Sequence, residues 1–253
     1  MITLKSSNMI NRFSIGALMF FLMLLSCDKS MNNSADAGTG TGGSMARFTI
    51  VGNYLYVVDY SNLEVYDISN GYALKKGSIF IGFTIETIFP YNDKLFIGSR
   101  DGMFIYSLQD PKRPAKIGAA RHLRSCDPVV ANDSVSYVTL RSGQACGVVT
   151  DGLYIYDIKD ITNPKLLKLM ELSTPYGLGV KDSVVFVCRD AAGLTAVNVK
   201  NPSNPKELYT IKDGEFIDVI PYENLLICYV KSGLMLYDIS NPGRIMKVAD
   251  LMY

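Results

Sequence analysis

Residues 233–242, with the sequence GLMLYDISNP, decide the fold because related stretches recur along the chain. These are NLEVYDISNG from Asn62, GMFIYSLQDP from Gly102, GLYIYDIKDI from Gly152 and GLTAVNVKNP from Gly193. The Leu or Met at the second position lies at residues 63, 103, 153, 194 and 234, at spacings of 40, 50, 41 and 40 residues. A nearly constant period of this length indicates an array of structural repeats.

Each repeat is predicted to contain four short strands. In the second repeat these strands cover residues 86–89, 94–99, 103–108 and 115–119, and residues with turn-forming side chains separate them. In the third strand of a repeat, such as residues 153–156 (LYIY), both alternating faces are apolar, so both faces of the sheet should be buried. Radial repetition of four-stranded sheets buries both faces, and the sequence therefore predicts an all-β fold, a β-propeller of five four-stranded blades.

The propeller is expected to cover residues 45–253, with a first strand at 47–51 and a last strand at 246–251. The repeats begin and end in phase, so the sequence shows no strand exchange between the first and last blades. Closure by packing of the first blade on the fifth, or by a strand added from the preceding segment, both stay open.

Residues 1–27 are typical of a bacterial lipoprotein signal peptide. Lys5 and Arg12 precede an apolar run at residues 15–25, which is short for a membrane-spanning helix, and LLSC at residues 24–27 resembles a lipobox. Cys27 is the expected lipidation site, and residues 28–44, rich in Ser, Asn, Gly and Thr, are expected to form a flexible tether. The prediction is an outer-membrane lipoprotein, periplasmic or surface-exposed. The alternative is an ordinary signal peptide or a buried helix, followed by a chance cysteine.

The repeats resemble the LVIVD repeat, and the chain is similar in particular to lipoproteins of this family from Bacteroidetes. Five segments carry the likeness: residues 44–60, 85–99, 125–143, 176–188 and 217–229, of which SCDPVVANDSVSYVTLRSG at 125–143 is the most specific. The fourth repeat departs from the pattern, with Ala196, Val197 and Asn198 where others have a Tyr-Asp or Tyr-Ser pair. The resemblance implies a propeller at the cell envelope and no established activity.

Four cysteines remain once Cys27 is set aside. Cys126 lies at the start of the third repeat and Cys146 in the long loop of the same repeat, at the same end of a blade, which makes a disulfide between them geometrically reasonable. Two unpaired thiols are the alternative. Cys188 and Cys228 end the second strands of their repeats, where free buried thiols are expected.

Alignment of the repeats places two sets of residues at one mouth of the central channel. The first set lies at the start of each inner strand and consists of Arg47, Glu86, Thr87, Asp127, Tyr176 and Asp218. The second set follows each second strand and consists of Tyr60, Arg100, Arg141, Arg189 and Lys231. A cluster of cations suggests a ligand with carboxylate or phosphate groups. The alternative is a solvated rim in which these cations pair with nearby carboxylates such as Asp101, Asp127, Asp190 and Asp218.

The composition narrows the function classes. The formal net charge is +1, so nothing draws the whole chain to nucleic acid, and His122 is its only histidine, which argues against multi-histidine metal sites. No catalytic motif, cofactor motif or metal motif is present, and no catalytic residue is assigned. We therefore expect a binding or interaction module for an anionic glycan or a protein partner. A glycoside hydrolase that uses channel carboxylates such as Glu86, Asp127 and Asp218 and a structural envelope scaffold are the alternatives.

Overall fold

The computed structural model describes residues 42–121, 128–143 and 150–253, all within one compact unit that covers residues 37–253. Cys27, His122, Cys126, Asp127 and Cys146, and with them the predicted disulfide and lipid anchor, lie outside the described residues. In the part of the chain that is described, no helix could cross a membrane.

Twenty strands form five antiparallel sheets of four consecutive strands each, which confirms the predicted five-bladed β-propeller. Blade 1 comprises β1 (Phe48–Val51), β2 (Tyr54–Val58), β3 (Asn62–Asp67) and β4 (Leu74–Phe80). Blade 2 comprises β5 (Ile85–Tyr91), β6 (Lys94–Ser99), β7 (Gly102–Ser107) and β8 (Ala115–Arg121). Blade 3 comprises β9 (Val129–Ala131), β10 (Val135–Leu140), β11 (Gly152–Asp157) and β12 (Lys165–Glu171). Blade 4 comprises β13 (Leu178–Lys181), β14 (Val184–Cys188), β15 (Leu194–Asn198) and β16 (Lys206–Ile211). Blade 5 comprises β17 (Phe216–Tyr222), β18 (Leu225–Val230), β19 (Gly233–Asp238) and β20 (Met246–Met252).

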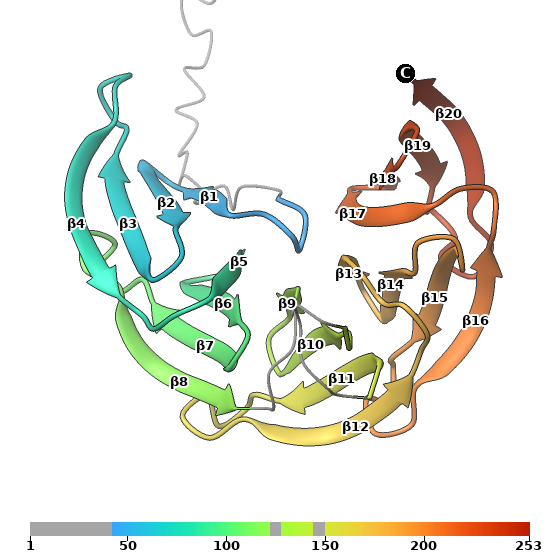
Figure 1. Ribbon diagram of the computed structural model, residues 1–253, viewed down its shortest axis with the longest axis horizontal. Helices are drawn as coiled ribbons and strands as arrows, with labels where there is room; N and C mark the ends of the chain where they lie inside the picture. Colours follow the sequence, from blue (N-terminus) through green and yellow to red (C-terminus); the bar gives the residue numbers. More distant parts are fainter. Residues whose placement is uncertain (1–41, 122–127, 144–149) are drawn as a thin grey trace, which may run out of the picture. The chain divides into compact units, whose positions relative to one another are not determined.

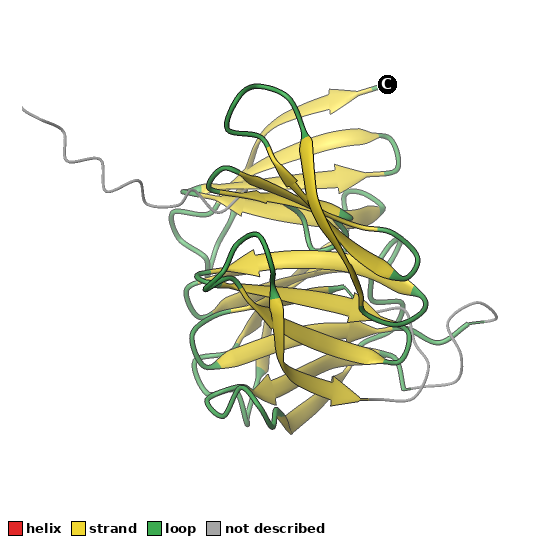
Figure 2. Ribbon diagram, turned by 90° about the vertical axis from the view of Figure 1, so that its left-hand side faces the viewer, coloured by secondary structure: helices red, strands yellow, loops and turns green. Residues whose placement is uncertain are grey.

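The first strand of each blade lies nearest the centre and the fourth lies outermost (Figure 1). Figure 2 shows that strands and loops alone build the described part of the chain. The strand bounds agree closely with those expected from the repeat, including the first and last strands.

A glycine at the start of the third strand, or directly before it, explains one constant feature of the repeat. A Cβ atom at Gly102, Gly193 or Gly233 would lie 2.0–2.3 Å from a carbonyl oxygen of the fourth strand, and each residue has a positive φ. Glycine therefore allows the third and fourth strands to pair closely at this point.

The Asp at the end of the third strand bonds to the backbone of the turn that follows. The carboxylates of Asp67, Asp157 and Asp238 accept hydrogen bonds from the N–H two residues later, at 3.0, 2.9 and 2.7 Å. These residues cap turns.

The blades pack on one another through apolar clusters that lie between neighbouring sheets. One cluster joins blades 1 and 2, a second joins blades 2 and 3, a third joins blades 3 and 4, and a fourth joins blades 4 and 5. Among the described residues there is no corresponding cluster between blades 5 and 1. Figure 1 shows these two blades apart at their outer strands. Neither form of closure considered from the sequence, direct packing of blade 1 on blade 5 or a fifth strand in a sheet, occurs in the described part of the chain.

A segment that precedes blade 1 nevertheless reaches blades 4 and 5 near the centre. The Ser44 hydroxyl donates a hydrogen bond to Asp218 Oδ1 at 3.0 Å and accepts one from the backbone N–H of Leu178 at 2.7 Å. Ser44 is buried. We call this set of contacts the Ser44 clasp.

Candidate functional site

A pocket of about 250 Å³ lies at the end of the blades where the inner strands begin. Residues from the first four blades line it: Met45, Arg47, Glu86, Thr87, Pro128, Arg141, Pro175 and Tyr176. Five of the residues named from the sequence therefore meet in one place: Arg47, Glu86, Thr87, Arg141 and Tyr176. We call it the mouth pocket.

Arg141 and Tyr176 form a stacked pair on one side of the mouth pocket. The guanidinium carbon of Arg141 lies 3.8 Å from the centroid of the Tyr176 ring, which is a cation–π contact. Tyr176 is fixed by its backbone: its N–H donates to the carbonyl of Cys188, and its carbonyl accepts from the hydroxyl of Thr139. Stacking holds the guanidinium plane in one orientation, which favours two-pronged recognition of a carboxylate.

Arg47 and Glu86 contribute opposite charges to the same pocket. Arg47 is exposed and donates a hydrogen bond of 3.4 Å from Nη2 to the carbonyl of Ile85. Glu86 accepts a hydrogen bond of 2.9 Å from Arg100 Nε and forms an ion pair with it. Arg100 is thus held beside the pocket by its bond to Glu86.

Like Arg100, the cations Arg189 and Lys231 of the second predicted set do not line the mouth pocket. Arg189 donates to the carbonyl and hydroxyl of Ser173 and to the hydroxyl of Thr195, at 3.1, 2.6 and 3.1 Å. Lys231 forms ion pairs with Asp190, at 2.8 Å, and with Glu215. Lys231 thus pairs with carboxylates, as the rim alternative expects, whereas these hydrogen bonds of Arg189 go to uncharged oxygens.

Asp218, which the sequence placed in the same set as Arg47, belongs to the Ser44 clasp and not to the lining of the mouth pocket. Its Oδ2 also accepts a hydrogen bond of 3.3 Å from the N–H of Met45. Burial raises the pKa of Asp218 to about 6, although hydrogen bonds from Met45 and Ser44 oppose this shift. The role of this carboxylate is to hold the segment before β1.

This arrangement removes two carboxylates from the hydrolase alternative. Glu86 is paired with Arg100, and Asp218 is not a lining residue of the pocket, so these two do not form a facing pair across it. No group of three His, Cys, Asp or Glu residues that could hold a metal ion occurs among the described residues.

Three exposed aromatic side chains near Arg47 form a group that the repeat pattern does not reveal. Tyr60, Phe80 and Phe83 are each 62% exposed; Phe83 lies 6.5 Å from Tyr60 and 5.4 Å from Phe80 between ring centroids. The backbone of Ile85 links this group to Arg47. Its N–H donates a hydrogen bond to the carbonyl of Tyr60, and its carbonyl accepts a hydrogen bond from the Arg47 side chain. We call these three residues the aromatic ledge. Phe80 and Phe83 lie outside the repeat pattern, and only Tyr60 was in an aligned column.

Cys188 and Cys228 are free and buried, as expected. Burial raises the pKa of both thiols, which disfavours the nucleophilic thiolate form.

The family of the LVIVD repeat matches residues 42–73, which include the first three strands of blade 1. No curated protein matches the chain.

Several solved structures share the fold at low sequence identity. The computationally designed protein Ika8 is 13% identical with a TM-score of 0.58, and the match covers 81% of this chain and 60% of Ika8. A functionally unknown protein from Desulfotomaculum acetoxidans is 10% identical with a TM-score of 0.60 and coverage of 79% and 66%. A protein from Lactobacillus plantarum is 10% identical with a TM-score of 0.61 and coverage of 79% and 68%. The chain thus spans about two thirds of the length of these structures or less. The chain carries an LVIVD repeat in its first blade, and by fold it is a five-bladed β-propeller.

Proposed function

We propose that this protein is a binding module that holds a carboxylate-bearing ligand, an anionic glycan, in the mouth pocket. The observation that carries the proposal is the convergence of Arg47, Arg141 and Tyr176 from three blades on one pocket. Arg47 directly precedes β1, Arg141 directly follows β10, and Tyr176 lies two residues before β13, so each side chain is held at the end of a strand, which suits recognition without movement of the chain. A protein partner with exposed acidic residues is the second source of the same chemistry.

The charge of the site supports an acidic ligand. Arginine binds carboxylates through paired N–H donors, and the stack on Tyr176 reduces the conformational freedom that Arg141 would lose on binding. Glu86 remains neutralised by Arg100, so the pocket does not present an uncompensated negative charge from this residue to the ligand.

The aromatic ledge supports a sugar. The C–H face of a pyranose ring packs on an aromatic ring, and three exposed aromatic rings next to a cationic pocket offer such a platform. A chain of acidic sugars would extend from the pocket across Tyr60 and Phe83.

The test is a binding screen of the purified protein on uronic-acid and sialic-acid oligosaccharides, with neutral oligosaccharides of equal length beside them. Arg47→Gln should weaken binding of the acidic sugars by roughly tenfold or more, because a charge-assisted hydrogen bond is lost. Arg244→Gln, in an exposed turn of blade 5, is the matched control and should bind as the parent does.

The variant Phe83→Ala distinguishes an anionic glycan from an acidic protein as the ligand. It should weaken binding to a glycan and leave binding to an acidic peptide unchanged. Equal binding of neutral and acidic sugars, or full binding by Arg47→Gln, would contradict the proposal.

We further propose that the chain is a lipoprotein of the Bacteroidetes type, anchored to the outer membrane through lipid on Cys27. The basic residues, apolar run and lipobox of residues 1–27 support this. A tether of small and polar residues would let the binding face reach ligands away from the membrane.

A further inference from the structure

Five blades share only four apolar interfaces in the described chain, so one face of blade 5 and one face of blade 1 remain uncovered. In blade 1, the side chains that face blade 2 are Tyr56, Val58, Leu63 and Val65, and none is more than 2% exposed. The repeat places Ile227, Tyr229, Leu234 and Leu236 at the equivalent positions of blade 5. There Tyr229 is 46% and Leu234 is 36% exposed.

The uncovered face of blade 5 is apolar across all four strands. Strand pairing places Ile220 opposite Ile227 on β17 and β18, Tyr229 opposite Leu234 on β18 and β19, and Leu234 opposite Leu251 on β20. Leu251 is 63% exposed. The charged residues of this face lie at its ends and are engaged: Asp218 in the Ser44 clasp and Asp238 in its turn. We call this surface the blade 5 face.

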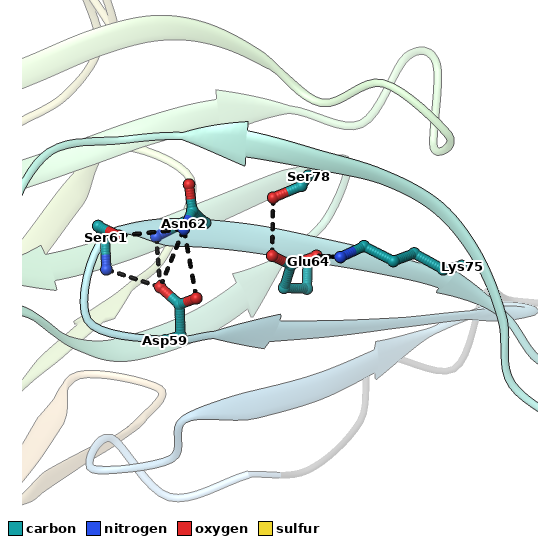
Figure 3. Close-up of polar contacts among 6 residues, drawn as sticks. All are labelled: Asp59, Ser61, Asn62, Glu64, Lys75 and Ser78. Atoms are coloured by element: carbon teal, nitrogen blue, oxygen red, sulfur yellow. Dashed lines mark hydrogen bonds and ion pairs between the residues drawn. The ribbon is translucent and has the colours of Figure 1, made fainter.

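The uncovered face of blade 1 differs in chemistry. Phe48 and Ile50 near the centre are apolar and exposed. Further out, Glu64 forms an ion pair with Lys75 at 2.6 Å and accepts a hydrogen bond from Ser78 at 2.7 Å (Figure 3). The residues that align with Glu64 in blades 2 and 5 are Phe104 and Met235, and both are buried. The side chains of Glu64 and Lys75 are 14% and 54% exposed, and an apolar sheet packed here would remove the remaining water from this ion pair.

We propose that the blade 5 face is the interface of a symmetric dimer, in which it packs against the blade 5 face of a second copy. An exposed apolar sheet face of this kind marks an interaction site. Because the face is uncharged between its ends, two copies can meet without like-charge repulsion, and two-fold contacts of one patch with itself are the commonest in homo-oligomers. Sheet-on-sheet packing of this type already joins the blades within the chain. Packing on blade 1 of the second copy would instead bury Glu64 and Lys75 against Leu234.

The test is the oligomeric state of the full chain, measured by sedimentation in density-matched detergent over a range of protein concentrations. The parent should sediment at twice the chain mass. Leu234→Lys should raise the dimer dissociation constant by roughly a hundredfold, because it places two charges in an apolar interface. Leu251→Lys, on the exposed outer strand, repeats the test at a site where folding of the blade is least at risk. Phe48→Lys, on the uncovered face of blade 1, is the matched control and should remain dimeric.

A parent that is monomeric at all concentrations would overturn the proposal. Loss of the dimer in Phe48→Lys would also overturn it, because the contact would then involve blade 1. The proposal would also be overturned if both Leu234→Lys and Leu251→Lys stayed dimeric while circular dichroism showed that both variants are folded. Since no residue of the blade 5 face lines the mouth pocket, sugar binding by the monomeric variants tests the proposed function separately.

Discussion

Asp218 shows how one buried side chain can act on the whole ring. Its carboxylate accepts hydrogen bonds from Ser44 and Met45, and a Cβ atom on Gly43 or on Gly177 would lie 2.1 Å from one of its oxygens. Two glycines therefore make room for the carboxylate. The clasp joins the segment before blade 1 to blades 4 and 5, where no apolar cluster does so among the described residues.

The first prediction concerns the pH dependence that Asp218 causes. Its pKa is raised from 3.8 to about 6 in the folded chain, mainly by burial, so the folded state binds its proton more tightly than the unfolded state does. This group therefore adds stability as pH falls from about 7 to about 4, by up to about 3 kcal/mol, and that contribution is lost as pH rises through 6. The free energy of unfolding of the parent should rise relative to that of Asp218→Asn over this range, as measured by urea unfolding.

The comparison with the variant is necessary because other carboxylates act in the opposite direction. Hydrogen bonds lower the pKa of Asp67, chiefly through the Ser69 side chain, and of Asp238, chiefly through the Ser240 backbone. Asp182→Asn, in an exposed turn, is the control. A difference between the parent and Asp218→Asn that does not change with pH would refute the assignment.

At the scale of the strand, a β-bulge recurs where the third and fourth strands pair. The register shifts at the equivalent point in all five blades, for example between Ile105 and Tyr106 and between Leu236 and Tyr237. A bulge bends and twists the outer strand. In blade 2, the bent strand brings Gly118 against the backbone of the next blade, where a Cβ atom would lie 1.9 Å from the carbonyl oxygen of Ile161.

The second prediction follows from this contact. Gly118→Ala should lower the free energy of unfolding by about 1–3 kcal/mol or more, because the backbone of Ile161 must move to admit the methyl group. Gly77 occupies the equivalent position of blade 1, and its Cβ atom would lie 3.8 Å from the nearest atom, a carbonyl oxygen of Lys112. Gly77→Ala is therefore the matched control and should change stability far less. Equal losses in the two variants would show that the strand conformation, and not the contact between blades, demands glycine.

At the scale of the whole molecule, the proposed roles divide between separate surfaces. The mouth pocket and aromatic ledge would bind the ligand, the blade 5 face would join two copies, and the lipid on Cys27 would hold the assembly at the envelope. These surfaces do not compete, because the mouth pocket takes no lining residue from blade 5.

The third prediction tests the anchor. Cys27→Ala should abolish incorporation of labelled fatty acid and move the protein from the membrane fraction to the soluble fraction, because the thiol that carries the lipid is absent. Ser26→Ala, which keeps a small residue before the cysteine, should remain with the membrane. Continued membrane association and labelling of Cys27→Ala would disprove lipidation at this residue.

Much of this protein could be predicted from local pattern. The five repeats with their strand bounds, the turn role of Asp67, Asp157 and Asp238, and the meeting of Arg47, Glu86, Arg141 and Tyr176 follow from residues that recur at a fixed period. Because every blade has the same strand order, equivalent residues of different blades lie at the same end of the ring and at the same distance from its centre. Alignment of the repeats therefore predicts which residues of different blades lie close together.

Only the tertiary structure decided what each of those residues contacts. Asp218 was aligned with Arg47, yet it bonds to Ser44, which lies 174 residues earlier; Arg189 and Lys231 were aligned with Arg141, yet they pair with rim residues. The apolar positions of blade 5 match those of blade 1, and sequence alone predicts burial for both. Whether an apolar face is covered depends on the angle between each blade and the next. Packing at the four interfaces between blades sets these angles, and together they decide whether blade 5 reaches blade 1. The sequence pattern of a single repeat does not contain this information.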